Sequence, residues 1–161
     1  MNTDKLLARM TAQSSGPNPK EPGGGVAMYT AADISLIASS APHMSFHALM
    51  VKCCHDPISL KVIYSWLRRV SVEDWFNNEE NNQRTIQISQ ANKLISLAIL
   101  AWDNPLAPDV KTTADIARSI GTAYGTFQTR YQRHYHYLVK ELQYVEAVGR
   151  SALAGYMKQD E

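Results

Sequence analysis

The spacing of the apolar residues constrains the fold of this chain more than any other feature of its sequence. Before Asn104 and Pro105, one apolar face repeats at helical intervals through Ile86, Ala91, Leu94, Ile95, Ala98 and Trp102. Nowhere do apolar and polar residues alternate for long enough to indicate a half-buried strand. The sequence therefore predicts an all-α chain, an irregular helical bundle.

The amino-acid composition indicates the broad class of protein. The 161 residues suffice for one domain or two small ones, and an apolar content of 45% supports a core and excludes bulk disorder. The formal net charge is +1, so whole-chain charge indicates no partner. Cys53 and Cys54 are adjacent and cannot form a disulfide framework, so we interpret both as thiols. Without an apolar signal core or a membrane-length stretch, we expect a soluble intracellular protein.

The N-terminal region differs from the rest of the chain. Residues 1–28 read as a short helix followed by a flexible arm rich in proline and glycine, and residues 29–161 as a helical body. Two interpretations of the arm stay open: a tail without a role, or a tether for a small N-terminal contact element.

Residues that cap or break helices predict where the helices of the helical body begin and end. We predict helices over residues 30–41, 45–54 and 56–69, a short turn over 71–77 and a polar connection over 77–83. Ser45 is expected to cap the second helix, and Asp56 with Pro57 is a cap followed by proline at the first helical position. The third helix is expected to turn four residues inward, namely Ile58, Val62, Trp66 and Leu67.

Aromatic and cationic side chains gather along this part of the chain, at Trp66, Arg68, Arg69, Trp75 and Phe76. We interpret the aromatic residues as core and the arginine pair as a helix-terminal cation pair that suits the helix dipole. A partner-binding surface is the alternative.

The segment over residues 112–142 predicts a helix-turn-helix. Thr112 or Thr113 would cap a short helix over residues 114–120, and Gly121 would end it in a left-handed turn. Thr122 would then cap a second helix that begins at Ala123 and continues as a long final helix. In this layout the second helix enters the major groove of DNA.

Apolar residues in this segment fall where such a motif buries its contacts. Ala117 lies four residues before Gly121, where a larger side chain would push the helices apart, and Ile116 and Ile120 share its helix. The second helix carries one coherent apolar stripe, made of Tyr124, Phe127, Tyr131, His134, Leu138, Leu142 and Val145. We interpret His134 as a core histidine.

The opposite side of the second helix is basic. Between Ile116 and Lys140 the chain has four Lys and Arg residues and no Asp or Glu. Arg, Gln and Thr side chains read base edges, while Lys and Arg neutralise phosphates. The alternative is a helical hairpin in an ordinary bundle with one solvated basic face.

The sequence gives less support for a metal site or for catalysis. Five residues could offer a Cys/His metal set on paper, namely His43, His47, Cys53, Cys54 and His55. Adjacent cysteines chelate awkwardly, so we predict buried cysteines and no metal, and leave open what the cluster binds. No phosphate-binding loop, G-x-S-x-G, H-E-x-x-H or glycine-rich dinucleotide turn occurs. We therefore expect a non-enzymatic protein without a cofactor.

The order of these features resembles a known family. A small helix (TDKLLARM), a Pro/Gly-rich arm, a helical body and the segment TTADIARSIGTAYGTFQTRYQRHYHYLVKEL resemble the Q antitermination proteins of lambdoid phages, closest to the phage 21 type. The resemblance covers most of residues 29–153. The lambda-type Q carries a zinc-binding cysteine cluster, and with Cys53 and Cys54 alone this chain carries no such module.

The resemblance implies a mechanism. Q proteins bind a DNA element at the phage late promoter and load onto RNA polymerase paused just downstream with sigma factor still bound. They travel with the polymerase through pauses and terminators, and the phage 21 type narrows the RNA exit channel. The implied partners are double-stranded DNA and bacterial RNA polymerase with sigma factor. Nascent RNA and a second copy of the chain on DNA are further candidates, and the implied location is the bacterial host cytoplasm.

Residues of the predicted motif fit these roles. The expected base-reading residues are Tyr124, Thr126, Gln128, Thr129 and Arg133. The expected phosphate contacts are Arg118, Thr122, Arg130, His136 and Lys140. Two other functions stay open: a helix-turn-helix repressor or activator that acts by DNA occupancy, and a helical protein-interaction module without a DNA role.

Overall fold

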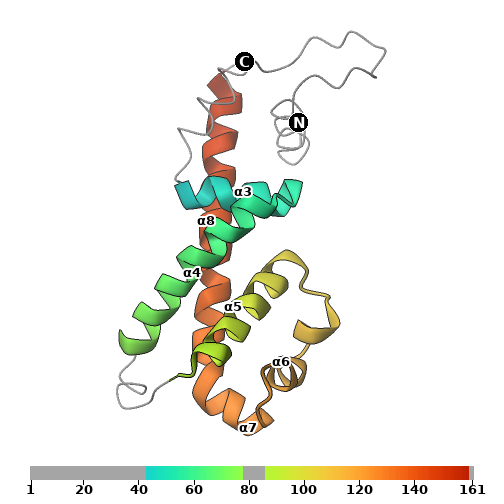
Figure 1. Ribbon diagram of the computed structural model, residues 1–161. Helices are drawn as coiled ribbons and strands as arrows, with labels where there is room; N and C mark the ends of the chain where they lie inside the picture. The colour runs from blue at the N-terminus through green and yellow to red at the C-terminus, as the bar shows by residue number, and fades with distance from the viewer. Residues whose placement is uncertain (1–42, 78–85, 160–161) are drawn as a thin grey trace. The chain divides into compact units, whose positions relative to one another are not determined.

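The computed structural model describes residues 43–77 and 86–159, except for the side chains of Cys53, Tyr156, Met157 and Gln159. Within these ranges every regular element is helical and there is no strand, which confirms the all-α prediction (Figure 1). The arm, the helix predicted over 30–41 and most of the polar connection over 77–83 lie outside the described residues. No helix within the described ranges is both long and apolar enough to cross a membrane.

Among the described residues, five α-helices have eight residues or more, and three shorter helical elements lie between α5 and α8. The five helices are α3 (His43–Cys54), α4 (Pro57–Asn77), α5 (Ile88–Asp103), α6 (Thr113–Ile120) and α8 (Gln132–Gln159). The shorter elements are η2 (Pro108–Val110), α7 (Tyr124–Thr126) and the π-helical turn η3 (Phe127–Tyr131). The long final helix predicted from the sequence is confirmed.

The described residues form two compact units. One unit contains residues 43–60 and 145–159, and the other contains residues 61–77 and 86–144. Each of the long helices α4 and α8 contributes one end to each unit.

In the first unit, α3 lies close to the C-terminal part of α8. A Cβ atom at Gly149 would lie 2.8 Å from Leu49 Cδ1 and 3.0 Å from the Ser45 carbonyl oxygen, so glycine permits this approach. Ser45 is buried within α3, which begins at His43, so the prediction that Ser45 caps this helix is wrong. A serine packed against a neighbouring helix is not free to accept a capping hydrogen bond from the backbone N–H groups of the first turn.

The start of α4 follows the sequence prediction. The Ser59 backbone N–H donates to Asp56 Oδ2 at 2.9 Å, and Pro57 occupies the first helical position, where its missing N–H costs nothing. The helix then continues to Asn77, so the predicted end near Arg69 and the separate turn from Ser71 are wrong. Neither proline nor glycine interrupts α4 after its first residue, and Ser71 faces the core instead of capping a new turn.

The buried face of α4 is shifted from the predicted one. Leu67 is buried as expected, and Val62 and Trp66 are half-buried. Ile58 is exposed because its neighbour Ser59, about 100° further around the helix, takes the buried position in the first turn. Ile63 and Trp75 are buried instead. Since α4 does not end at Arg69, the interpretation of Arg68 and Arg69 as a helix-terminal pair is also wrong.

In the second unit, α5 carries the apolar face predicted from its spacing. Leu94, Ile95, Ala98 and Trp102 are buried. Ile86 precedes the helix, and Ala91 is half-buried. The helix ends where Asn104 precedes Pro105, and the Asn104 N–H donates to the Leu100 carbonyl at 2.7 Å. η2 then leads into α6, which contacts both η2 and α5.

Candidate nucleic-acid interface

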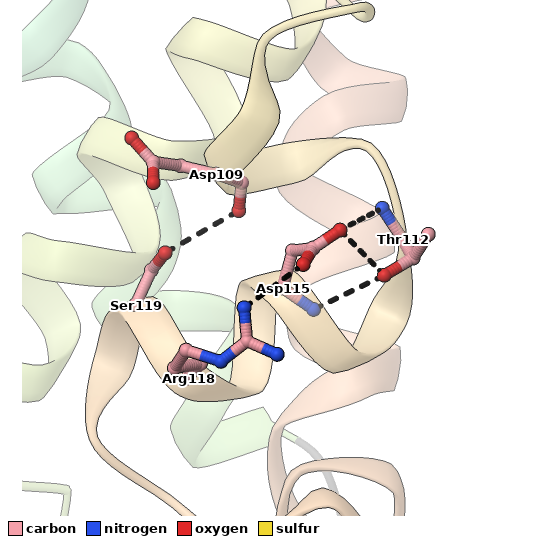
Figure 2. A network of polar contacts seen from close by, with 5 residues as sticks. All are labelled: Asp109, Thr112, Asp115, Arg118 and Ser119. Atoms are coloured by element: carbon pink, nitrogen blue, oxygen red, sulfur yellow. Dashed lines mark hydrogen bonds and ion pairs between the residues drawn. The ribbon is translucent and has the colours of Figure 1, made fainter.

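A capping box fixes the start of α6. The Asp115 N–H donates to Thr112 Oγ1 at 3.2 Å, and the Thr112 N–H donates to Asp115 Oδ2 at 3.1 Å (Figure 2). Thr112 is therefore the cap, which settles the choice between Thr112 and Thr113. The Thr112 hydroxyl also donates to the same carboxylate at 2.6 Å and, with the Thr112 N–H, holds the pKa of Asp115 below its ordinary value.

Arg118 and Ser119 extend this network, as Figure 2 shows. Arg118 Nη1 lies 3.2 Å from Asp115 Oδ1, and the Arg118 side chain is 77% exposed. The Ser119 hydroxyl donates to the Asp109 carbonyl at 3.4 Å and links α6 to η2. Exposed ion pairs contribute little to stability, so Arg118 could leave Asp115 for a phosphate at little cost in free energy.

The turn after α6 has the predicted left-handed residue. Gly121 has φ 77° and ψ 33°, and its N–H donates to the Arg118 carbonyl at 3.0 Å. Ile116, Ala117 and Ile120 are buried as expected, and α6 contacts α7. The use of this pair of helices as a DNA-binding motif stays a prediction.

Replacing Gly121 tests the turn. Gly121→Ala is expected to lower the free energy of unfolding by about 1–2 kcal/mol, because a Cβ disfavours the left-handed conformation. A Cβ there would meet nothing within 4 Å, so no steric clash adds to this cost. The matched control is Gly125→Ala, equally uncrowded but helical, which should stabilise by about 0.5–1 kcal/mol. Urea unfolding measures both, and equal effects from the two variants would contradict the prediction.

Thr122 does not cap the second helix, contrary to the prediction. The cap position is Ala123, which has no side chain to accept a hydrogen bond, and the helix begins at Tyr124. The Thr122 hydroxyl instead points back and donates to the Ala117 carbonyl at 3.5 Å. This bond reinforces the turn and leaves Thr122 half-buried.

A π-helical turn within the second helical segment was not predicted. The Gln132 N–H donates to the carbonyl of Phe127, five residues earlier, and the Thr129 hydroxyl donates to the Gly125 carbonyl at 2.9 Å. Such turns hold more residues than an α-turn and are frequent at functional sites. This wider turn brings Tyr135 onto the buried face beside His134, and burial raises the pKa of Tyr135 to about 12.

The apolar stripe of this segment is largely confirmed. Its buried members are Phe127, Tyr131, His134, Leu138, Leu142 and Val145. Tyr124 is 50% exposed, so its predicted place in the buried stripe is wrong, because it lies in the first turn before the packed part of the helix. Its exposure suits its other predicted role, in base reading.

Most of the predicted DNA-contacting residues lie on the surface. The exposed ones are Arg118, Tyr124, Thr126, Gln128, Thr129, Arg133, His136 and Lys140. Gln128 Nε2 donates to the Tyr124 hydroxyl at 2.9 Å, so these two side chains act as one polar unit. Arg130 is half-buried, with its guanidinium carbon 5.4 Å from the centre of the Tyr131 ring.

A surface hollow brings several of these residues together. Its volume is about 470 Å³, and it is lined by Gln128, Gln132, Arg133, His136, Tyr137 and Lys140. Four of these six were predicted contacts, from both the base-reading and the phosphate sets. Gln132 and Tyr137 were not among the predicted contacts. We call this group the hollow face.

One border of the hollow face is acidic. Burial raises the pKa of Tyr137, and the nearby carboxylates of Glu141, Asp74 and Glu73 raise it further. These carboxylates would repel a nucleic-acid backbone on the Tyr137 side.

The same unit contains a polar network around a buried histidine. His134 is 1% exposed; its Nε2 lies 2.8 Å from the Ser71 hydroxyl and its Nδ1 lies 2.5 Å from Asp74 Oδ2. No local motif revealed this group, because Ser71 and Asp74 are more than fifty residues before His134. The order serine, histidine, aspartate is that of a hydrolase triad. Ser71 is buried within α4, however, where neighbouring backbone N–H groups bond along the helix and are not free to bind an oxyanion.

The network therefore gives both ring nitrogens of a buried histidine a hydrogen-bond partner. A neutral imidazole donates from Nδ1–H to Asp74 and accepts from the Ser71 hydroxyl at Nε2. Within the described ranges no three His, Cys, Asp or Glu side chains lie close enough together to hold a metal ion. Comparisons with protein-family models, curated proteins and solved structures find no significant match to this chain.

Proposed function

We propose that this chain binds double-stranded DNA through α6 and the exposed side of residues 124–140, and acts as a phage transcription antitermination factor. The observation that carries the DNA part is the hollow face, where two cationic side chains, a histidine and two glutamines converge. A helix with its side chains is about 10–12 Å across, which suits a major groove about 12 Å wide.

The arrangement supports a division of roles. Tyr124, Thr126, Gln128, Thr129 and Arg133 lie near the start of the segment, where a recognition helix contacts base edges. Arg118 on α6 and His136 and Lys140 further along α8 would hold phosphates on either side. The half-buried Thr122 and Arg130 would contribute phosphate contacts only after side-chain movement.

The antitermination part rests on the resemblance to phage 21-type Q proteins. On that basis the DNA target is a late-promoter element, and the partners are bacterial RNA polymerase with sigma factor and nascent RNA at the exit channel. The chain would act in the bacterial cytoplasm, without a cofactor, and two copies could associate on DNA.

DNA binding across a salt series tests the proposed interface. Purified protein should retain one fragment of its source genome more tightly than others. Arg133→Ala should lower that preference by about 1–3 kcal/mol, because a lost base contact costs discrimination. Lys140→Ala should weaken binding to all fragments and flatten the salt slope by about one unit.

The matched control is Arg69→Ala, which removes another exposed arginine, from α4 in the same unit. Arg69→Ala should leave the preference unchanged. Binding that is equal on all fragments and insensitive to Arg133→Ala would reject the interface and favour a helical protein-interaction module.

A transcription assay separates antitermination from simple occupancy. With purified polymerase paused near the retained site, the protein should increase read-through of a downstream terminator. Tight DNA binding without read-through would favour a helix-turn-helix repressor or activator, which usually binds an inverted repeat as a symmetric dimer.

A further inference from the structure

Two histidines of α3 face each other in the first unit. His43 and His47 are four residues apart, so their side chains lie on the same side of the helix. Their Nε2 atoms are 3.3 Å apart, and the rings meet edge to face with centroids 4.6 Å apart. His43 is exposed and His47 is half-buried, so the pair is open to solvent on one side.

The other nitrogen of His47 is held by the start of α4. His47 Nδ1 lies 2.8 Å from the hydroxyl of the buried Ser59. Ser59 in turn donates to Asp56 from both its hydroxyl and its N–H, and these bonds hold the pKa of Asp56 below its ordinary value. Because the Ser59 hydroxyl hydrogen is directed to Asp56, its oxygen accepts from Nδ1–H of His47.

These hydrogen bonds, from His47 to Ser59 and from Ser59 to Asp56, fix the tautomer of His47. With the proton on Nδ1, Nε2 carries a lone pair, and that atom faces His43. Metal-binding histidines almost always donate their second ring N–H to such a partner, which sets both tautomer and ring orientation.

The spacing of the two nitrogens suits a chelated ion. With metal–nitrogen bonds of about 2.0–2.1 Å, a separation of 3.3 Å gives a nitrogen–metal–nitrogen angle of about 104–111°, close to tetrahedral. Histidines at positions i and i+4 of a helix are a known zinc-binding spacing. We propose that His43 and His47 form a two-histidine chelate for a divalent transition-metal ion, with water completing its coordination. This site departs from the sequence prediction of no metal.

The ligand set defines which ions fit. Neutral imidazole suits Zn²⁺, Cu²⁺, Ni²⁺ and Co²⁺, whereas Mg²⁺ and Ca²⁺ prefer oxygen ligands. No third His, Cys, Asp or Glu joins the pair among the side chains that the structure describes. The site is therefore open and exchangeable, and its affinity should rise from Co²⁺ to Ni²⁺ to Cu²⁺.

Calorimetric titration of the full-length protein with Ni²⁺ tests the chelate. The wild type should bind one ion, and Mg²⁺ should give no signal. His43→Ala, at an exposed position whose loss leaves the fold intact, should abolish this binding. Ser59→Ala should weaken it about 10–100-fold by releasing the orientation of His47. The control is His55→Asn, which removes another exposed histidine at φ 52°, a conformation that asparagine tolerates, and should bind as the wild type does.

The Co²⁺ absorption spectrum gives an independent result. Coordination by histidine and water should produce visible d–d bands without an intense thiolate-to-metal charge-transfer band in the near ultraviolet. That band would show that Cys53 or Cys54 binds the ion and would overturn the proposal. Undiminished Ni²⁺ binding by His43→Ala would overturn it as well.

Discussion

Trp75→Ala is expected to cost about 3–5 kcal/mol of unfolding free energy, the largest effect of any single truncation in α4. Trp75 is 1% exposed, stacks on Tyr131 with ring centroids 5.9 Å apart, and meets His134 edge to face at 5.4 Å. Removing the indole would leave a cavity under the helix that carries the hollow face. Domains of this size are stable by about 5–15 kcal/mol, so the loss is a large fraction of the total.

The adjacent residue supplies a matched control. Phe76 is also aromatic and lies in the same helix, but it is 62% exposed. Phe76→Ala should change the free energy by no more than about 0.5 kcal/mol. Urea unfolding followed by circular dichroism measures both variants. Similar losses from the two would mean that Trp75 does not anchor the core of this unit.

This pair shows how far the sequence could place the core. Both aromatics were interpreted as core residues, and that interpretation is confirmed for Trp75 and wrong for Phe76. Neighbours in a helix point about 100° apart, so only one of them can face a given partner. Choosing between them required knowing that α4 continues past Ser71, which no proline or glycine signalled.

Elements with local signals were the most predictable. The face of α5 repeats over several turns, and the ends of α6 depend on Thr112 and Gly121, whose chemistry acts within a few residues. The π-helical turn has no such signal, so the burial of Tyr135 was missed.

In the candidate sites, too, the sequence predicts features that depend on local spacing and misses those that depend on packing between distant residues. The polar side of the second helical segment followed from helical spacing, and eight of the ten predicted contacts are exposed. The roles of Ser71 and Asp74 depend on packing between residues about sixty positions apart in the sequence, as shown by their bonds to His134. The orientation of His47 likewise depends on Ser59, a residue of the next helix.

Acidification is expected to destabilise the fold through His134. Burial lowers its pKa below the ordinary 6.5, although Asp74 opposes this shift by hydrogen bond and charge. As the pH falls below 6.5, the unfolded chain takes up a proton that the folded chain resists, so the unfolding free energy decreases. For one group the slope is at most about 1.4 kcal/mol per pH unit, or about 2 kcal/mol between pH 6.5 and 5. Above pH 7 this contribution should be constant.

His134→Leu isolates the effect. At pH 8 the variant should be less stable by about 1–3 kcal/mol, because the buried Ser71 hydroxyl loses its partner. Between pH 8 and 5, however, it should lose less stability than the wild type. The residual slope includes a contribution from His47, whose pKa burial also lowers and which the variant retains. Urea midpoints measured across this pH range give the comparison, and parallel pH profiles for variant and wild type would show that His134 does not resist protonation in the fold.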